Sequence, residues 1–170
     1  MVRQLLSLAM VDRAETELHD PVHILPTLRD VVNDLSRPAS EKDLKVRLPD
    51  TQAVLENSNP ILMAVALRNV IENAISAAPE QSEIDIFIET TSGHLCILVM
   101  DRGPGIAETD RSKITDRFFH GTGVTTNGSG LGLAIVETAV KRLGGSLRFA
   151  PRKDGGEVVS LEFPLQQGSI

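Results

Sequence analysis

Three groups of residues in this sequence have types and spacings that could do chemistry, and the first is a pair of asparagines. Asn69 and Asn73 lie four positions apart in a strongly apolar segment. On a helix this spacing places both amides on one face, one turn apart. Asparagine lowers helix propensity and is costly to bury unpaired, so two on one face, opposite the apolar side, indicate a polar ligand. Two solvated surface amides are the alternative interpretation.

The second group is the run DRGPGI, residues 101–106, which follows the apolar run LCILVM. A carboxylate at the end of a strand can accept a hydrogen bond from an exocyclic amine, such as that of adenine. Gly103 and Gly105 allow a close backbone approach or a positive φ. An ordinary turn would also satisfy this pattern.

The third group is GSGLGL, residues 128–133, at the point where a loop is expected to become a helix. Unpaired N–H groups at a helix start form a ready site for phosphate. A lone GxGxG pattern is weak, because flexible loops also collect glycine. Here it opens a well-patterned helix, and the three groups follow one another in a single direction, which favours a nucleotide site.

The elements that must position these groups can be predicted from periodicity and from start and stop signals. Asn59-Pro60 is a helix start, with asparagine as the N-cap and proline at the first position. Gly144-Gly145 is a helix stop. The first predicted helix is a short lead-in at residues 5–9, with residues 12–17 as a charged continuation. The other predicted helices are residues 26–35, with Pro38 just beyond the end, 60–78 and 131–143. The predicted strands are 19–23, 45–48, 53–55, 84–90, 94–100, 146–150 and 157–163.

Helices placed between antiparallel strand pairs predict an α+β fold. We expect a two-layer α/β sandwich, with a mixed, mostly antiparallel sheet packed against three helices. Residues 84–90 and 94–100 form one predicted hairpin, and residues 146–150 and 157–163 form the second. The continuous apolar run of residues 94–100 is typical of a strand covered on both faces.

Composition limits the function classes. A chain of 170 residues suffices for one domain, and its net charge of −6 argues against broad nucleic-acid binding. The single cysteine, Cys96, predicts a reducing compartment and a small buried side chain on a strand. No apolar run approaches the roughly 18 residues that a membrane span needs. We therefore expect these residues to be soluble and to make no membrane contact.

The motifs together resemble the catalytic domain of sensor histidine kinases. LRNVIENAISAAP resembles the N box of that family, DRGPGI the G1 box, DRFFHG the F box and GSGLGLAIV the G2 box. The resemblance extends over residues 21–164 and reaches the wider Bergerat-type ATPase group, which includes gyrase, the Hsp90 chaperones and MutL. It implies the Bergerat fold, with ATP and Mg²⁺ as cofactors. It also implies phosphotransfer to a histidine on a dimerisation domain and relay to a response regulator receiver domain.

The resemblance also implies roles for individual residues. Asn73 would coordinate Mg²⁺, Asn69 would contribute to the same polar face, and Asp101 would bind the adenine amino group. Residues 107–127 would be a flexible ATP lid, anchored hydrophobically by Phe118 and Phe119. The expected ATP-binding residues are Asn69, Asn73, Asp101, Gly103, Gly105, Ile106, Phe118, Gly128, Ser129, Gly130, Leu131, Gly132 and Leu133, with Asn69 and Asn73 also expected to be catalytic.

Some positions depart from relatives in the wider group. Relatives that hydrolyse ATP carry a glutamate at the position of Asn69, and an amide cannot act as a general base. Water attack should therefore be poorly assisted, as suits a kinase. Ser76 and Ala77 stand where many relatives have a basic and an aromatic residue, and Thr115 replaces a phenylalanine of the F box. We expect these departures to affect affinity more than identity.

The phospho-accepting histidine is not found in this sequence. None of the four histidines has the H-[ED]-x-x-x-P setting of the acceptor helix. Residues 1–18 resemble the end of the dimerisation helix, residues 19–166 the catalytic domain, and residues 167–170 a tail. We expect the chain to be the cytoplasmic portion of a longer bacterial sensor kinase anchored in the inner membrane. A serine kinase or ATPase relative, and a degenerate nucleotide-sensing or docking module, are the alternatives.

Overall fold

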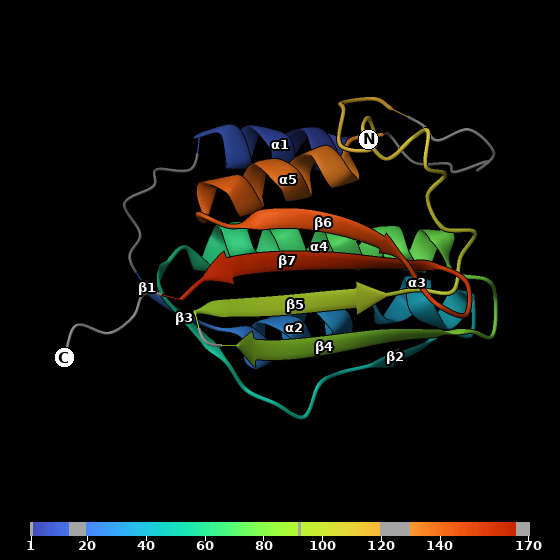
Figure 1. The fold of residues 1–170 in the computed structure, drawn as a ribbon, viewed down its shortest axis with the longest axis horizontal. Helices are drawn as coiled ribbons and strands as arrows, with labels where there is room; N and C mark the ends of the chain where they lie inside the picture. The colour runs from blue at the N-terminus through green and yellow to red at the C-terminus, as the bar shows by residue number, and fades with distance from the viewer. Residues whose placement is uncertain (1, 14–19, 92, 120–129, 166–170) are drawn as a thin grey trace.

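The computed structural model describes residues 2–13, 20–91, 93–119 and 130–165. Helices and strands alternate irregularly along the chain (Figure 1). The helices are α1 (Val2–Arg13), α2 (Ile24–Asp34), α3 (Ser36–Glu41), α4 (Pro60–Ala77) and α5 (Gly132–Arg142). The strands are β1 (Asp20–His23), β2 (Lys45–Arg47), β3 (Val54–Ser58), β4 (Glu83–Thr91), β5 (His94–Met100), β6 (Ser146–Pro151) and β7 (Glu157–Pro164).

The main sheet has five strands in the order β2-β4-β5-β7-β6. Its pairs are antiparallel except β2–β4, which is parallel. The two predicted hairpins are confirmed as β4–β5 and β6–β7. Strands β1 and β3 form a separate antiparallel pair. The sheet is therefore mixed and mostly antiparallel, as predicted.

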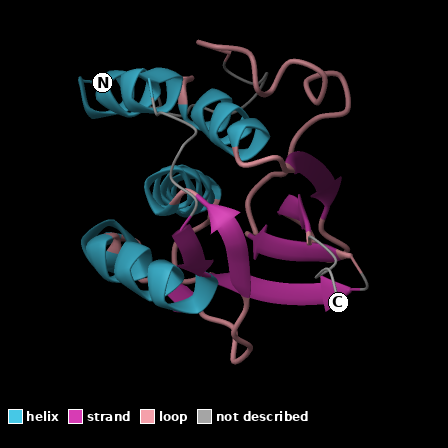
Figure 2. Ribbon diagram, turned by 90° about the vertical axis from the view of Figure 1, so that its left-hand side faces the viewer, coloured by secondary structure: helices cyan, strands magenta, loops and turns pink. Residues whose placement is uncertain are grey.

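The helices lie on one side of the sheet, so the fold is the predicted two-layer sandwich (Figure 2). Alternate strand residues face the helices, and the largest fully buried side chains include Ile97, Leu161 and Phe163 from the sheet and Leu67 and Ile71 from α4. Helices α2, α4 and α5 form the helical layer, and α1 lies beside α5 (Figure 1). Among the described residues, no helix combines the length and apolarity needed to cross a membrane.

Helix α4 carries the asparagine pair and is held at both ends. The Asn59 side chain accepts hydrogen bonds from the backbone N–H groups of Ile61 (3.0 Å) and Leu62 (3.1 Å), as an N-cap does. At the other end, the Lys42 ammonium donates to the carbonyls of Ile75, Ser76 and Ala78 at 2.9, 3.0 and 2.6 Å. A cation on these terminal carbonyls also interacts favourably with the helix dipole.

Helix α3 is not among the predicted elements, because a proline just beyond a helix is typical of the end of that helix. Pro38 instead lies in the first turn of α3, two residues after Ser36. The N–H groups of a first turn have no intrahelical partner, so proline is tolerated there.

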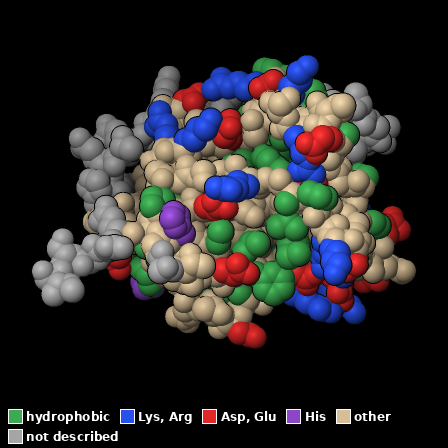
Figure 3. Space-filling view, in the orientation of Figure 1, with side chains coloured by type: hydrophobic (Ala, Val, Ile, Leu, Met, Phe, Trp, Pro, Cys, Tyr) green, Lys and Arg blue, Asp and Glu red, His purple; other side chains and the backbone are tan. Residues whose placement is uncertain are grey.

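The prediction that the strand at residues 94–100 is covered on both faces is wrong. Burial alternates along β5, with Leu95, Ile97 and Val99 buried and the residues between them only partly so. Cys96 lies on the outer face and is likewise only partly buried. Hydrophobic side chains gather near the middle of the face that Figure 3 shows, and Phe87 of β4 is 48% exposed. The outward-facing apolar side chains of β5 are therefore only partly covered, by neighbouring side chains of the sheet, because no helix in the described part of the chain lies on that face (Figure 2).

Candidate nucleotide-binding site

The two asparagines of α4 differ in their surroundings. Asn69 is only 3% exposed, and its Nδ2 donates to the Val65 carbonyl at 2.9 Å. Asn73 is half-buried. The expectation that both amides share a face opposite the core needs correction, because Asn69 is itself buried. Its bond to the preceding turn compensates part of the cost of burial.

Both glycine-containing motifs, DRGPGI and the described residues of GSGLGL, lie close to α4. A Cβ added at Gly132, the first residue of α5, would lie 4.0 Å from the Asn69 Oδ1. A Cβ added at Gly103 would lie 2.6 Å from the Ala77 carbonyl oxygen, near the C-terminal end of α4. The fold therefore brings the three groups singled out in the sequence to one helix.

Asp101 follows directly after β5 and is only 3% exposed. Its Oδ1 accepts a hydrogen bond from the Gly103 N–H at 2.7 Å, and its own N–H donates to the Glu157 carbonyl at 3.1 Å. Burial raises the pKa of the Asp101 carboxyl, while the hydrogen bonds from the backbone act in the opposite direction. The result is a fixed acceptor in a region of low dielectric constant.

The turn between β6 and β7 packs closely on the Asp101 backbone. Gly156 has φ +107°, and a Cβ there would overlap the Asp101 carbonyl. Gly105 has φ +74°, and a Cβ there would lie 3.2 Å from the Gly156 carbonyl oxygen. At these two positions, glycine is needed both for the conformation and for the space.

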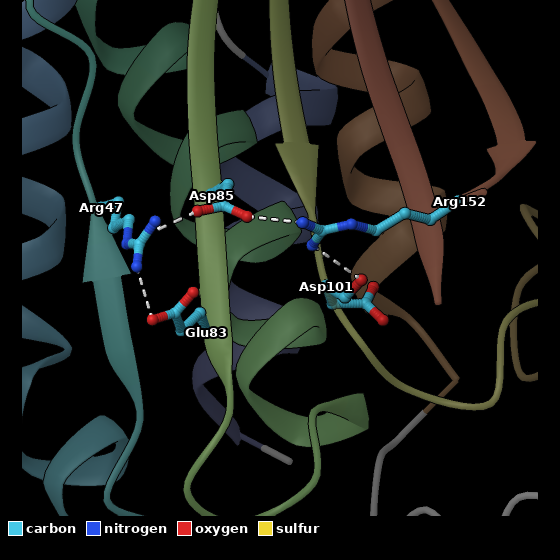
Figure 4. A network of polar contacts seen from close by, with 5 residues as sticks. All are labelled: Arg47, Glu83, Asp85, Asp101 and Arg152. Atoms are coloured by element: carbon cyan, nitrogen blue, oxygen red, sulfur yellow. Dashed lines mark hydrogen bonds and ion pairs between the residues drawn. The ribbon is translucent and has the colours of Figure 1, made fainter. Parts of the chain in front are cut away.

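An arginine–carboxylate network supports the same region from the sheet (Figure 4). Arg152 pairs with Asp85 (2.6 Å) and donates to the Asp101 carbonyl (3.3 Å). Arg47 pairs with Glu83 at 2.6 Å and approaches Asp85 at 3.9 Å. Sequence reasoning missed these residues, because they come from β2, β4 and the β6–β7 turn.

Glu157, the first residue of β7, was also missed. Its Oε2 accepts from the Ile106 N–H at 3.0 Å, which fixes a residue predicted to bind ATP. Its two oxygens accept from the Nη1 and Nη2 of Arg111 at 2.7 and 3.2 Å. The sequence indicated only a turn, GGE, before an alternating strand, and it did not indicate which residues Glu157 would contact.

The predicted lid is described only as far as residue 119. The Phe118 side chain is 59% exposed, so the prediction that it anchors the lid hydrophobically is wrong for this structure. Its backbone makes the contact instead, because the Phe118 N–H donates to the Gly130 carbonyl at 2.9 Å. Both residues have positive φ, +64° and +68°. Phe119 is half-buried.

The G2 motif is only partly described. Gly128 and Ser129 lie outside the described residues. Leu131 is fully buried and Leu133 is 8% exposed, so both side chains are part of the packed interior. Leu133 lies in the first turn of α5, where backbone N–H groups have no intrahelical partner and could bind a phosphate.

Glu72, beside Asn73, is a carboxylate and so a candidate catalytic base. Its Oε1 accepts from the Arg68 Nε at 3.2 Å, and Arg68 also pairs with Asp34 at 2.8 Å. The carboxylate beside Asn73 is therefore engaged in ion pairing and is not free on the helix surface.

A fold of this topology and a site of this composition define a class of nucleotide-binding proteins. Residues 58–167 match the family model described as histidine kinase-, DNA gyrase B- and HSP90-like ATPase. The chain belongs to this family.

Within the family, the chain is similar to sensor kinases. It is 32% identical over 159 residues to the sensor protein QseC of Salmonella typhi. The alignment covers 92% of this chain and 34% of QseC. It is 30% identical over 170 residues to the sensor protein kinase PmrB of Pseudomonas aeruginosa, which covers 98% and 35%. The chain therefore spans about a third of the length of these relatives, and it corresponds to the ATPase domain of two-component sensor histidine kinases.

Solved structures of histidine kinases share the fold. The mycobacterial sensor histidine kinase MprB aligns with a TM-score of 0.77 and 26% identity, covering 86% of this chain and 97% of that one. Full-length ShkA, solved in complex with AMPPNP, aligns with a TM-score of 0.74 and 29% identity, covering 96% of this chain and 35% of that one. The two-layer sandwich is thus the histidine kinase catalytic fold.

Proposed function

We propose that this chain binds Mg-ATP and donates the γ-phosphate to a histidine on a dimerisation domain outside this sequence. A response regulator receiver domain would then receive the phosphate. The observation that carries the proposal is the approach of both glycine motifs to α4, Gly103 at Ala77 and Gly132 at Asn69. This arrangement unites an adenine acceptor, a polar helix face and a phosphate-binding helix start.

At the adenine end, the Asp101 carboxylate accepts a hydrogen bond from the exocyclic amine. It is held for this by the N–H of Gly103 and by the backbone of Glu157. Ile106 and Gly105 form the wall beside it. Burial strengthens the interaction, because an acceptor away from water loses less to competing solvent.

At the phosphate end, the backbone N–H groups at the start of α5 bind phosphate oxygens, and Gly132 leaves space beside Asn69. The Asn73 amide oxygen fits Mg²⁺, which prefers oxygen ligands and retains bonds to water and substrate phosphates. Asn73 would therefore supply one ligand of the ion, and substrate phosphates and water would supply the others. When bound, the ion would neutralise charge on the phosphates.

The chain favours transfer to another protein over hydrolysis. Asn69 cannot take a proton from water, and the Glu72 carboxylate is paired with Arg68. We also propose that residues 1–18 end a dimerisation helix, that residues 107–127 form the lid, and that the complete kinase is anchored in a membrane with this part in the cytoplasm. The relatives QseC and PmrB are named as sensor proteins, which supports this assignment.

The test is phosphotransfer from ATP labelled at the γ-phosphate to a separately produced dimerisation domain of the complete kinase. We expect acid-labile, base-stable label on that domain, lost with Asn73→Ala. Label on a serine, or rapid release of free phosphate by this chain alone, would contradict the proposal.

A further inference from the structure

Glu157 joins three segments of the candidate site through one buried residue. Its side chain is 4% exposed. Its carbonyl accepts from the Asp101 N–H at 3.1 Å, and its carboxylate accepts from the Ile106 N–H at 3.0 Å. The same carboxylate binds Arg111, five residues beyond Ile106. Glu157 thus holds both the adenine acceptor and the wall that follows it.

The contact with Arg111 is a two-point ion pair. Its nitrogen–oxygen distances are 2.7 and 3.2 Å, and the Arg111 side chain is 17% exposed. The hydrogen bond to Glu157 is the main cause that raises the pKa of the Arg111 guanidinium. Paired, charge-assisted bonds fix orientation as well as distance. Loss of Arg111 would leave the buried Glu157 carboxylate without its counter-ion, whereas loss of Glu157 would leave Arg111 with Glu108 alone, at 3.1 Å.

Among the described residues of the site, few side chains could stack on an adenine ring. The sequence contains no tryptophan and no tyrosine. Ala77, whose carbonyl lies against Gly103, has no ring to stack. Recognition of the base therefore depends on where the backbone places Asp101, Gly105 and Ile106.

We propose that Glu157 and Arg111 are positioning residues for adenine recognition, which hold the Gly105–Ile106 wall against Asp101. The inference rests on the proposed function and deepens it, because it assigns the selectivity for adenine to an ion pair outside the recognised boxes. The pair touches the wall and the acceptor, not the nucleotide.

The test measures the affinities for ATP and GTP of the wild-type chain and of Arg111→Ala, Arg111→Lys and Glu157→Gln. We expect Arg111→Ala and Glu157→Gln to weaken ATP binding about tenfold and GTP binding less, so that the preference for ATP falls. Arg111→Lys keeps the charge but loses the two-point contact, and its ATP affinity should lie between wild type and Arg111→Ala. Thermal melting establishes that each variant is folded at the assay temperature.

The matched control is the Arg148–Glu162 pair at 3.0 Å, which also has its carboxylate on β7 but joins that strand to β6 and not to Arg111. Arg148→Ala and Glu162→Gln should bind ATP within about twofold of wild type, as expected for an exposed ion pair. The inference is overturned if folded Arg111→Ala binds ATP like wild type, or if it loses ATP and GTP affinity by the same factor. If the wild-type chain itself does not bind ATP, the proposed function fails, and the inference fails with it.

Discussion

The Asp101 carboxylate is buried, and we propose that it binds the ligand. Its Oδ1 accepts from the Gly103 N–H, and burial raises its pKa. A buried charge costs stability unless it is well paired. Under the proposed function, Asp101 would therefore favour ligand binding at some cost to the stability of the fold.

Asp101→Asn should separate these two effects. We expect ATP affinity to fall by tenfold or more, since a hydrogen bond to a charged group contributes about 1.5–3 kcal/mol. The melting temperature should stay the same or rise, because the buried charge is removed. Calorimetry and thermal melting measure both quantities. A large fall in melting temperature would mean that Asp101 chiefly stabilises the fold.

The raised pKa also predicts a pH dependence. Above that pKa, the charged carboxyl destabilises the folded chain. As the pH falls through it, the folded chain binds the proton before the unfolded chain does, and the cost is relieved. ATP affinity should decline over the same range, because the acceptor is lost. ATP titrations from about pH 8 to about pH 4.5 would show this in wild type and not in Asp101→Asn.

Prediction from sequence worked well for residues that belong to local motifs and poorly for those joined by the fold. Asp101 and Gly103 could be placed together because they are two positions apart. Arg111 and Glu157 are 46 positions apart, and only the meeting of the β6–β7 turn with the end of β5 joins them. The role of Phe118 was assigned by resemblance, whereas the structure places this residue at φ +64° and 59% exposed, and its residue type alone predicts neither.

At the scale of elements, the β6–β7 turn must approach Asp101 through glycine. Gly156→Ala should lower the free energy of unfolding by about 1–3 kcal/mol or more, since it adds strain at φ +107° and overlaps the Asp101 carbonyl. Gly155→Ala is the control, because φ is +91° there but nothing lies within 4 Å of the added Cβ. Urea unfolding compares the two. Equal losses would show that the close approach contributes nothing.

Helix α4 has a second support that can be tested separately. Lys42→Met should destabilise the chain by about 1–3 kcal/mol, because the last carbonyls of α4 lose three donors. Lys45→Met, at an exposed position on β2, should change stability by no more than about 0.5 kcal/mol. Denaturant unfolding measures both. A loss for Lys45→Met that matches Lys42→Met would contradict the capping role.

The fold class, both hairpins and the helix with the asparagines followed from periodicity, capping and turn signals. Two elements did not. A proline just beyond a helix is typical of a helix end, but Pro38 lies in the first turn of the next helix, α3. Strand β5 looks apolar throughout, although only one of its faces meets the helices. Which face is open depends on the strand's neighbours, and a single segment does not contain that information.

At the scale of the whole molecule, α1 packs against α5 and contacts α4. Val11 is fully buried, and the Asp12 carbonyl accepts from Arg142 of α5 at 2.7 Å. Leu5, Leu6 and Met10 are exposed. If residues 1–18 end another domain, their deletion should lower the melting temperature. ATP affinity should stay within about twofold of wild type, because none of the predicted ATP-binding residues is removed. Circular dichroism and calorimetry test this, and loss of ATP binding by the folded truncated chain would refute it.

The central claim is that one site on α4 binds Mg-ATP, and calorimetric titration of ATP with and without Mg²⁺ tests it most directly. The measurement is made on wild type and on Asn73→Ala, whose half-buried position makes unfolding an improbable source of the effect. We predict that wild type binds ATP more tightly with Mg²⁺ and that Asn73→Ala loses most of this gain. Absence of ATP binding by the folded wild-type chain would contradict the account, and the motifs would then serve only as a scaffold.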